Sequence, residues 1–159
     1  MIQLSRLRER LERFPLSFLQ LAMRLGVGAV FFRSGLLKID SWEFTIQLFR
    51  DEYKLPFIDP VLAAHAAATV ELGIPPLLVV GLATRFATLP LLGMIVVIQT
   101  LVYPNAWSDH LMWAAALLLI LTRGPGVFSL DHLIIRTQAA RRRAQPDDAR
   151  TPTDLPAGP

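Results

Sequence analysis

The chain has 159 residues, of which 53% are apolar and only 18% charged, and its mean hydropathy is +0.43. Soluble globular chains carry about 25% charged residues, and the stretch 86–108 contains no Asp, Glu, Lys, Arg or His, so the sequence predicts an integral membrane protein. Because there is no cysteine, disulfides, Cys-ligated zinc, iron–sulfur clusters and thiol chemistry by the chain itself are excluded.

Residues 1–15 alternate apolar and basic side chains at helical spacing. This pattern predicts an amphipathic helix on the surface of an anionic leaflet, and a frayed basic terminus is the alternative. We expect no cleaved signal peptide, because the first apolar segment is too long and lacks a small-residue cleavage site. The residues of the pattern are Leu4, Leu7, Leu11 and Phe14, with Arg6, Arg8, Arg10 and Arg13 between them.

Four apolar segments follow, and each is predicted to be a membrane-spanning helix. Short connections favour an antiparallel four-helix bundle, so the fold class is all-α. The second segment contains Pro75 and Pro76, which a bundle tolerates because neighbouring helices can satisfy the freed carbonyls. The segments are Leu16–Leu37, Ile58–Leu82, Phe86–Tyr103 and His110–Thr122, and the last is short enough that Trp107 is a further candidate member.

Residues 39–57 are predicted to form an outer loop that contains a short amphipathic surface helix. Its aromatic and aliphatic residues repeat at 4-3-4 spacing, Asp40 or Ser41 would cap it, and Pro56 would end it. Ser129 is the expected N-cap of a short helix through Arg136. The apolar residues of the surface helix are Trp42, Ile46, Phe49 and Tyr53.

Lysine and arginine residues outside the spans are distributed unequally, which predicts the topology. One side would carry eleven of them and the other only Lys38, Arg50 and Lys54. The positive-inside rule therefore places both termini in the cytoplasm and explains the net charge of +3 better than nucleic-acid binding does. The expected organisation is a cytoplasmic amphipathic segment (1–15), a four-helix transmembrane domain (16–136) and a disordered cytoplasmic tail (137–159).

Ionisable residues inside spans are costly and should be paired in the interior. Arg24 lies about 12 Å and Glu71 about 17 Å from the cytoplasmic ends of their segments at 1.5 Å per residue. The sequence therefore predicts an Arg24–Glu71 interaction. It would be either a structural salt bridge that fixes the helix register or a carboxylate that handles a proton or a ligand.

A second group of ionisable residues gathers toward the outer face. Two of them, His65 and His110, could ligate a metal, bind a polar headgroup such as a quinone carbonyl, or simply sit at the interface. We propose no metal site, because no third ligand lies in clear register. Aromatic residues at this level are typical of interfacial anchors. The group comprises Arg33, Lys38, His65, Asp109 and His110, and the aromatic residues are Tyr103, Trp107 and Trp113.

Several of these segments resemble the motifs of one membrane-protein family, DoxX. Its first-helix motif is similar to residues 31–38 (FFRSGLLK) and its second to Glu71-Leu72 with 81–85 (GLATR). Its fourth helix and exit turn resemble 110–113 (HLMW), 123–126 (RGPG) and 129–131 (SLD). Within the family, residues 51–56 (DEYKLP) and 103–107 (YPNAW) are most similar to the HvfX-type branch, whose members are encoded beside copper-binding peptide precursors and their modifying enzymes.

The resemblance implies a four-helix protein of the bacterial inner membrane with a role in redox processes. Relatives include a subunit of a thiosulfate:quinone oxidoreductase and a membrane partner in an oxidative-stress complex. The family's polar positions map onto Arg33, Lys38, Glu71, Arg85 and His110. From both lines of reasoning, Glu71 and His110 are the candidate catalytic residues. The candidate cofactor-binding residues are Arg33, Lys38, His65, Arg85 and Trp113, with quinone as the cofactor considered.

Three functions remain open. The first is a quinone-linked oxidoreductase or a subunit of one, whose electron donor would be a partner or the substrate. The second is a non-catalytic membrane partner in copper-binding peptide maturation or metal stress, which would dock another protein of the pathway and contact the bilayer. The third is a small oligomeric transporter with Glu71 as its coupling site, which the lack of inverted repeats disfavours.

Overall fold

A computed structural model describes residues 15–144, with side chains placed up to Arg142. This part of the chain contains six α-helices, two short π-helices and no strand. The predicted amphipathic segment (all but Pro15) and the part of the predicted tail from residue 145 onward lie outside the described residues. The α-helices are α2 (Leu16–Asp40), α3 (Trp42–Leu48), α4 (Pro60–Val80), α5 (Thr84–Val97), α6 (Trp107–Arg123) and α7 (Leu130–Ala144), and the π-helices are η1 (Phe49–Tyr53) and η2 (Ile98–Val102).

Local signals set most of the helix boundaries. The Asp59 carboxylate accepts hydrogen bonds from the first amides of α4, and Gly81 ends that helix in the left-handed conformation at φ +79°, which costs glycine little. Ser41 is the N-cap of α3, although its side chain makes no capping bond. Ser129 Oγ accepts from the His132 amide, as predicted for the start of α7.

Helix α7 does not end at Arg136 as predicted. It continues to Ala144, so residues 137–144, which we assigned to the disordered tail, are helical. This stretch is rich in Ala and Arg, which are among the strongest helix formers, and the preceding helix is already nucleated at Ser129. Residues with high intrinsic helix propensity can therefore extend the helix where composition alone suggests disorder.

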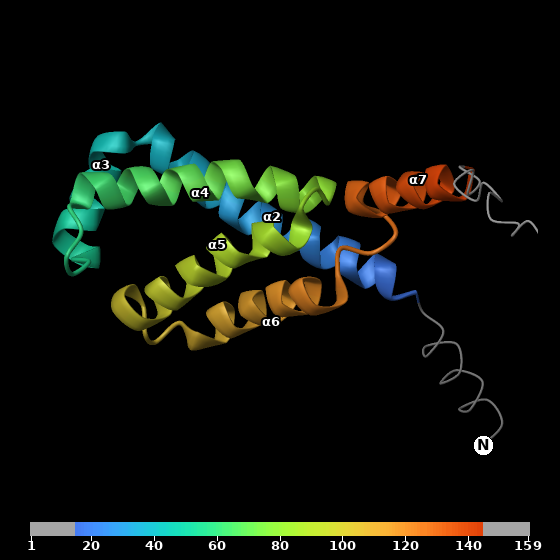
Figure 1. Cartoon of the computed structure of the whole chain (residues 1–159). Helices are drawn as coiled ribbons and strands as arrows, with labels where there is room; N and C mark the ends of the chain where they lie inside the picture. The colour runs from blue at the N-terminus through green and yellow to red at the C-terminus, as the bar shows by residue number, and fades with distance from the viewer. Residues whose placement is uncertain (1–14, 145–159) are drawn as a thin grey trace, which may run out of the picture.

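Three helices are long and apolar enough to cross a membrane, namely 16–40, 60–80 and 84–102. The 17 residues of α6 span about 26 Å. Helix α2 contacts α4 and α6, and α5 contacts the same two helices, while α3 and η1 lie across one end (Figure 1). Many large apolar side chains face outward, such as Phe86 at 77% exposed, which suits a lipid environment.

The apolar core lies where α2, α4, α5 and α6 meet. A smaller apolar cluster docks the α3–η1 segment onto α4. Figure 1 shows α5 diverging from α4 as it leaves the turn that joins them, and the space between the two helices is where the candidate site lies. The buried core residues are Val27, Phe31, Leu78, Leu91, Ile95, Leu117 and Ile120.

Candidate functional site

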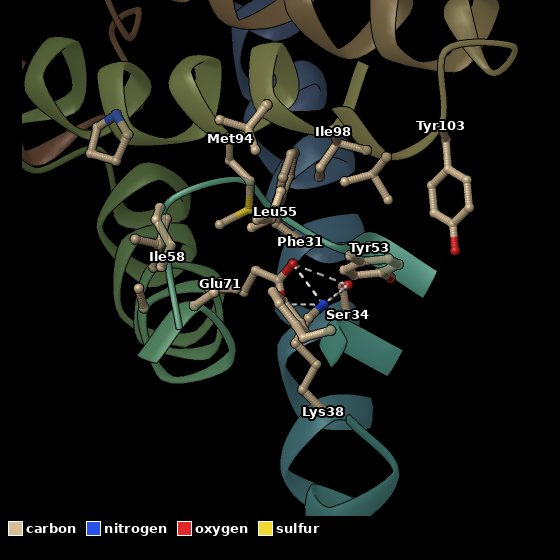
Figure 2. Close-up of a pocket in the computed structure, with 18 of the residues that line it drawn as sticks. Phe31, Ser34, Lys38, Tyr53, Leu55, Ile58, Glu71, Met94, Ile98 and Tyr103 are labelled. Carbon is tan, nitrogen blue, oxygen red and sulfur yellow. Dashed lines mark hydrogen bonds and ion pairs between the residues drawn. The ribbon is translucent and has the colours of Figure 1, made fainter. Parts of the chain in front are cut away.

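A cavity of about 780 Å³ lies between α2, α4, α5 and the first turns of α6, with η1 and residues 55–58 also lining it (Figure 2). Its wall is mainly apolar, which is typical of ligand pockets with few polar groups. The rim on α4 and α5 includes Leu62 and Val97, which are both exposed on the outer surface. The polar and titratable members of the wall are Ser34, Lys38, Tyr53, Glu71, Tyr103 and His110.

Lys38, Glu71 and Ser34 form one polar cluster in this apolar wall. Lys38 Nζ lies 2.7 Å from Glu71 Oε2 and donates to Oε1 at 2.9 Å and to Ser34 Oγ at 3.0 Å. Ser34 Oγ donates to Glu71 Oε1 at 3.3 Å. The side chains of Lys38 and Glu71 are only 13% and 4% exposed, so the ion pair offsets a large desolvation cost.

Helical spacing and a close helix contact build this cluster. Ser34 and Lys38 are one turn apart on α2 and therefore share a face. Between them, Gly35 has no Cβ, and one placed there would meet Leu72 at 2.8 Å and the Glu71 Cβ at 3.0 Å. The glycine thus allows α4 to approach α2 closely enough for Glu71 to reach Lys38.

His110 is a second polar group of the wall, on the first turn of α6. It is 5% exposed, and its Nδ1 lies 2.6 Å from Gln99 Oε1. Its ring centroid lies 5.5 Å from that of Trp113, which in turn lies 5.8 Å from the ring of Phe31. These aromatic contacts fix the imidazole against the cavity wall.

Tyr53 and Tyr103 meet at the end of the cavity near η1 and η2. Their ring centroids lie 5.7 Å apart, and Tyr103 Oη donates to Glu52 Oε1 at 2.6 Å. Burial, followed by the hydrogen bond to Glu52, raises the pKa of Tyr103 well above its usual value, so this phenol stays protonated as a donor. Tyr53 belongs to the segment 51–56 and Tyr103 to the segment 103–107. The adjoining helices η1 and η2 are π-helical, and such turns are frequent at functional sites.

The predicted Arg24–Glu71 pair is wrong. Arg24 is 1% exposed and binds four carbonyls instead, those of Leu78, Val79, Pro125 and Phe128. Two of them belong to the last turn of α4, whose carbonyls have no partner within the helix. Depth counting could not anticipate this, because the other two come from the α6–α7 turn, which folds back to the level of Arg24.

Asp131 completes this polar layer by capping α5. Its carboxylate accepts from the amides of Ala83 and Thr84 and from the Thr84 hydroxyl, at 2.8–2.9 Å. Burial acts to raise the pKa of Asp131, but these hydrogen bonds, together with the charge of Arg24, outweigh it and hold the pKa below its usual value. The layer joins the start of α7 to α2, α4 and α5 and lies at the opposite end of these helices from the cavity.

Four of the seven candidate site residues, Glu71, His110, Lys38 and Trp113, line the cavity. The other three are exposed and do not line it. Arg33 lies on an outer face of α2. His65 makes an edge-to-face contact with Trp42, with ring centroids 4.5 Å apart, and Arg85 reaches the Thr122 carbonyl at 3.5 Å. Between residues 15 and 144 no group of three or more His, Asp or Glu side chains is placed to hold a metal ion.

Sequence reasoning missed three residues of the site. Ser34 could have been found, because it precedes Lys38 by four positions on the same helix. Tyr53 was interpreted as part of the surface helix, and it is that helix which folds over the cavity. Gln99 carries no local signal, because its contact with His110 depends on how α5 and η2 return toward α6.

Comparison with known proteins gives one family and one relative. The DoxX family matches residues 19–104. An uncharacterized protein of Haemophilus influenzae is 32% identical over 124 residues, which cover 72% of this chain and 82% of that protein. No solved structure matches the chain.

Proposed function

This chain belongs to the DoxX family of membrane proteins, and we propose that it binds the headgroup of a membrane-dissolved quinone and takes part in a quinone-linked redox process. The observation that carries the proposal is the apolar cavity of about 780 Å³ with a Ser34–Lys38–Glu71 cluster and His110 in its wall. A flat ring with two polar substituents and a long apolar tail matches this combination of surfaces.

Each part of the wall has a role in this proposal. The Lys38 ammonium has three N–H groups. Two of them donate to Glu71 and Ser34, so one is available to a quinone oxygen. Glu71 is hydrogen-bonded to the same ammonium and can exchange the proton that accompanies quinone reduction or hydroquinone oxidation. The tail would leave between α4 and α5, over the exposed apolar residues Leu62 and Val97. The electrons come from a partner or from the substrate.

We also propose the arrangement in the membrane. Four helical segments are taken as antiparallel spans of the inner membrane, with both termini in the cytoplasm. The segments are α2, α4, α5 continued by η2, and α6. The basic residues of α7 and Arg123 at the end of α6 support this orientation. The cavity then lies toward the outer leaflet, because Lys38 and His110 are close to the ends of their helices on that side.

The test is to purify the protein in mild detergent, extract it with organic solvent and identify the bound small molecules by mass spectrometry. We expect near-stoichiometric quinone. Lys38→Met should lose it, because the polar headgroup contact is removed while the apolar volume is kept. Lys54→Met is the matched control, since Lys54 is exposed and does not line the cavity. Recovery of phospholipid alone from the wild type would overturn the proposal.

A second candidate function is that of a non-catalytic membrane partner in copper-binding peptide maturation or metal stress. The segments 51–56 and 103–107, which resemble the HvfX-type branch, contact each other through the two tyrosines. Helix α7 presents exposed basic residues, Arg136, Arg141 and Arg142, as a docking surface for a protein or a second copy. Stable co-purification with a modifying enzyme, with no quinone bound, would favour this function.

A further inference from the structure

Gln99 joins His110 to the loop that follows η2. Its side-chain Nε2 donates to the Pro104 carbonyl at 2.7 Å, and its Oε1 lies 2.6 Å from His110 Nδ1. Both distances are short for hydrogen bonds of this kind. The amide therefore bridges a backbone acceptor on one side and an imidazole nitrogen on the other.

The bridge determines which way the amide points. A backbone carbonyl only accepts hydrogen bonds, so the Gln99 group that faces Pro104 must be the NH₂. The flipped amide would set two oxygens against each other at 2.7 Å. The carbonyl oxygen of the Gln99 side chain is thus the atom that faces His110.

The same reasoning assigns the proton on the imidazole. The Gln99 carbonyl oxygen only accepts, so His110 Nδ1 must carry the hydrogen. In a neutral imidazole the other nitrogen, Nε2, then has the free lone pair. No hydrogen-bond partner of Nε2 is present between residues 15 and 144, and because Nδ1 is engaged by Gln99, Nε2 is the polar atom that the ring offers to the cavity.

An accepting nitrogen selects its ligand. It binds a hydroxyl and disfavours a carbonyl, because two facing lone pairs leave both groups unpaired in an apolar cavity. The Ser34–Lys38–Glu71 cluster contains both donors and an acceptor, so it accommodates either kind of oxygen. His110 is therefore the group that distinguishes a ring hydroxyl from a ring carbonyl.

We propose that Gln99 is a positioning residue that holds His110 in its Nδ1–H tautomer, so that Nε2 accepts a hydrogen bond from a ligand hydroxyl. This proposal rests on the proposed function and specifies it further: the reduced, hydroquinone form is the one that the cavity binds more tightly. The tautomer itself is a property of the protein and can be tested without any ligand.

The first experiment measures the tautomer by ¹⁵N NMR of the ring nitrogens in histidine-labelled protein in nanodiscs, at about pH 8, where an ordinary histidine is neutral. His110→Phe identifies the signals. We expect a protonated Nδ1 and an unprotonated Nε2. Gln99→Leu should abolish this fixed pattern, because it removes the acceptor for Nδ1. Gln47→Leu, at an exposed glutamine of α3, is the control. A protonated Nε2 in the wild type overturns the assignment.

The second experiment compares the binding of a short-chain quinone and its hydroquinone, followed by quenching of tryptophan fluorescence. We expect the wild type to prefer the hydroquinone, and Gln99→Leu to weaken hydroquinone binding about tenfold, as for the loss of one hydrogen bond, with much less change for the quinone. An equal loss of both forms would show that Gln99 is merely structural. If neither form binds the wild type, the proposed function and the ligand preference both fail, and the NMR result alone decides the tautomer.

Discussion

The Lys38–Glu71 ion pair allows a quantitative test of how α2 and α4 are held together. At a separation of 2.7 Å and an effective dielectric constant of about 20, the attraction is about 6 kcal/mol before desolvation is subtracted. Removing one member of a buried pair leaves the other charge unpaired and costs about 3–5 kcal/mol. We therefore expect Glu71→Leu and Lys38→Met each to lower the free energy of unfolding by about 3–5 kcal/mol.

The double variant should be much more stable than the sum of these losses implies. Replacing both partners by apolar groups of similar size is often close to neutral, so the coupling energy should be about 2–3 kcal/mol or more. The assay is reversible unfolding in mixed detergent micelles, followed by circular dichroism, for the wild type, both single variants and the double variant. Additive losses would refute the reasoning.

A second cycle distinguishes this pair from the one that we first predicted. Because Arg24 binds carbonyls and not Glu71, exchanging the charges of Arg24 and Glu71 should not restore stability. Recovery in the exchanged variant would mean that the two side chains do interact. The same unfolding assay measures both cycles, so the two results can be compared directly.

Three further predictions use the same unfolding assay. Arg24→Leu should cost at least about 4 kcal/mol, because it leaves several buried carbonyls without a donor, and a loss below about 1 kcal/mol would contradict this. Asp131→Asn should cost about 1–2 kcal/mol as a weakened helix cap. The pKa of Asp131 is lowered in the folded state. Its ionised carboxylate therefore stabilises the fold fully at pH values above the ordinary pKa of 3.8, and this stabilisation is lost as the pH falls through the folded-state pKa. Asp131→Asn should remove this acid sensitivity of the unfolding free energy. Gly35→Ala should destabilise the protein by about 1–3 kcal/mol through overpacking against α4, whereas Gly26→Ala, where an added Cβ meets nothing within 4 Å, should be neutral or slightly stabilising. Equal effects at the two glycines would argue against the close contact between α2 and α4.

Sequence patterns were sufficient for properties that depend on nearest neighbours along the chain. Long apolar segments placed the predicted spans within a few residues of the observed helices. The DoxX resemblance was also confirmed by the family match over residues 19–104. Composition gave a wrong prediction at residues 137–144, which are helical and not disordered. The charge pattern of this stretch is typical of disorder, but its residues have high helix propensity and continue a helix that already begins after Ser129.

Only the tertiary structure determined which polar groups meet. Depth along a helix is a one-dimensional quantity, and it placed Arg24 and Glu71 at similar levels without specifying how each helix is rotated or which turn folds back. The close approach at Gly35 pairs Glu71 with Lys38, and the α6–α7 turn supplies the carbonyls that bind Arg24. The Gln99–His110 contact likewise depends on how two helices return toward each other. Side-chain pairing is set by the packing of whole helices, because a buried charge accepts whichever partner that packing brings within hydrogen-bond distance.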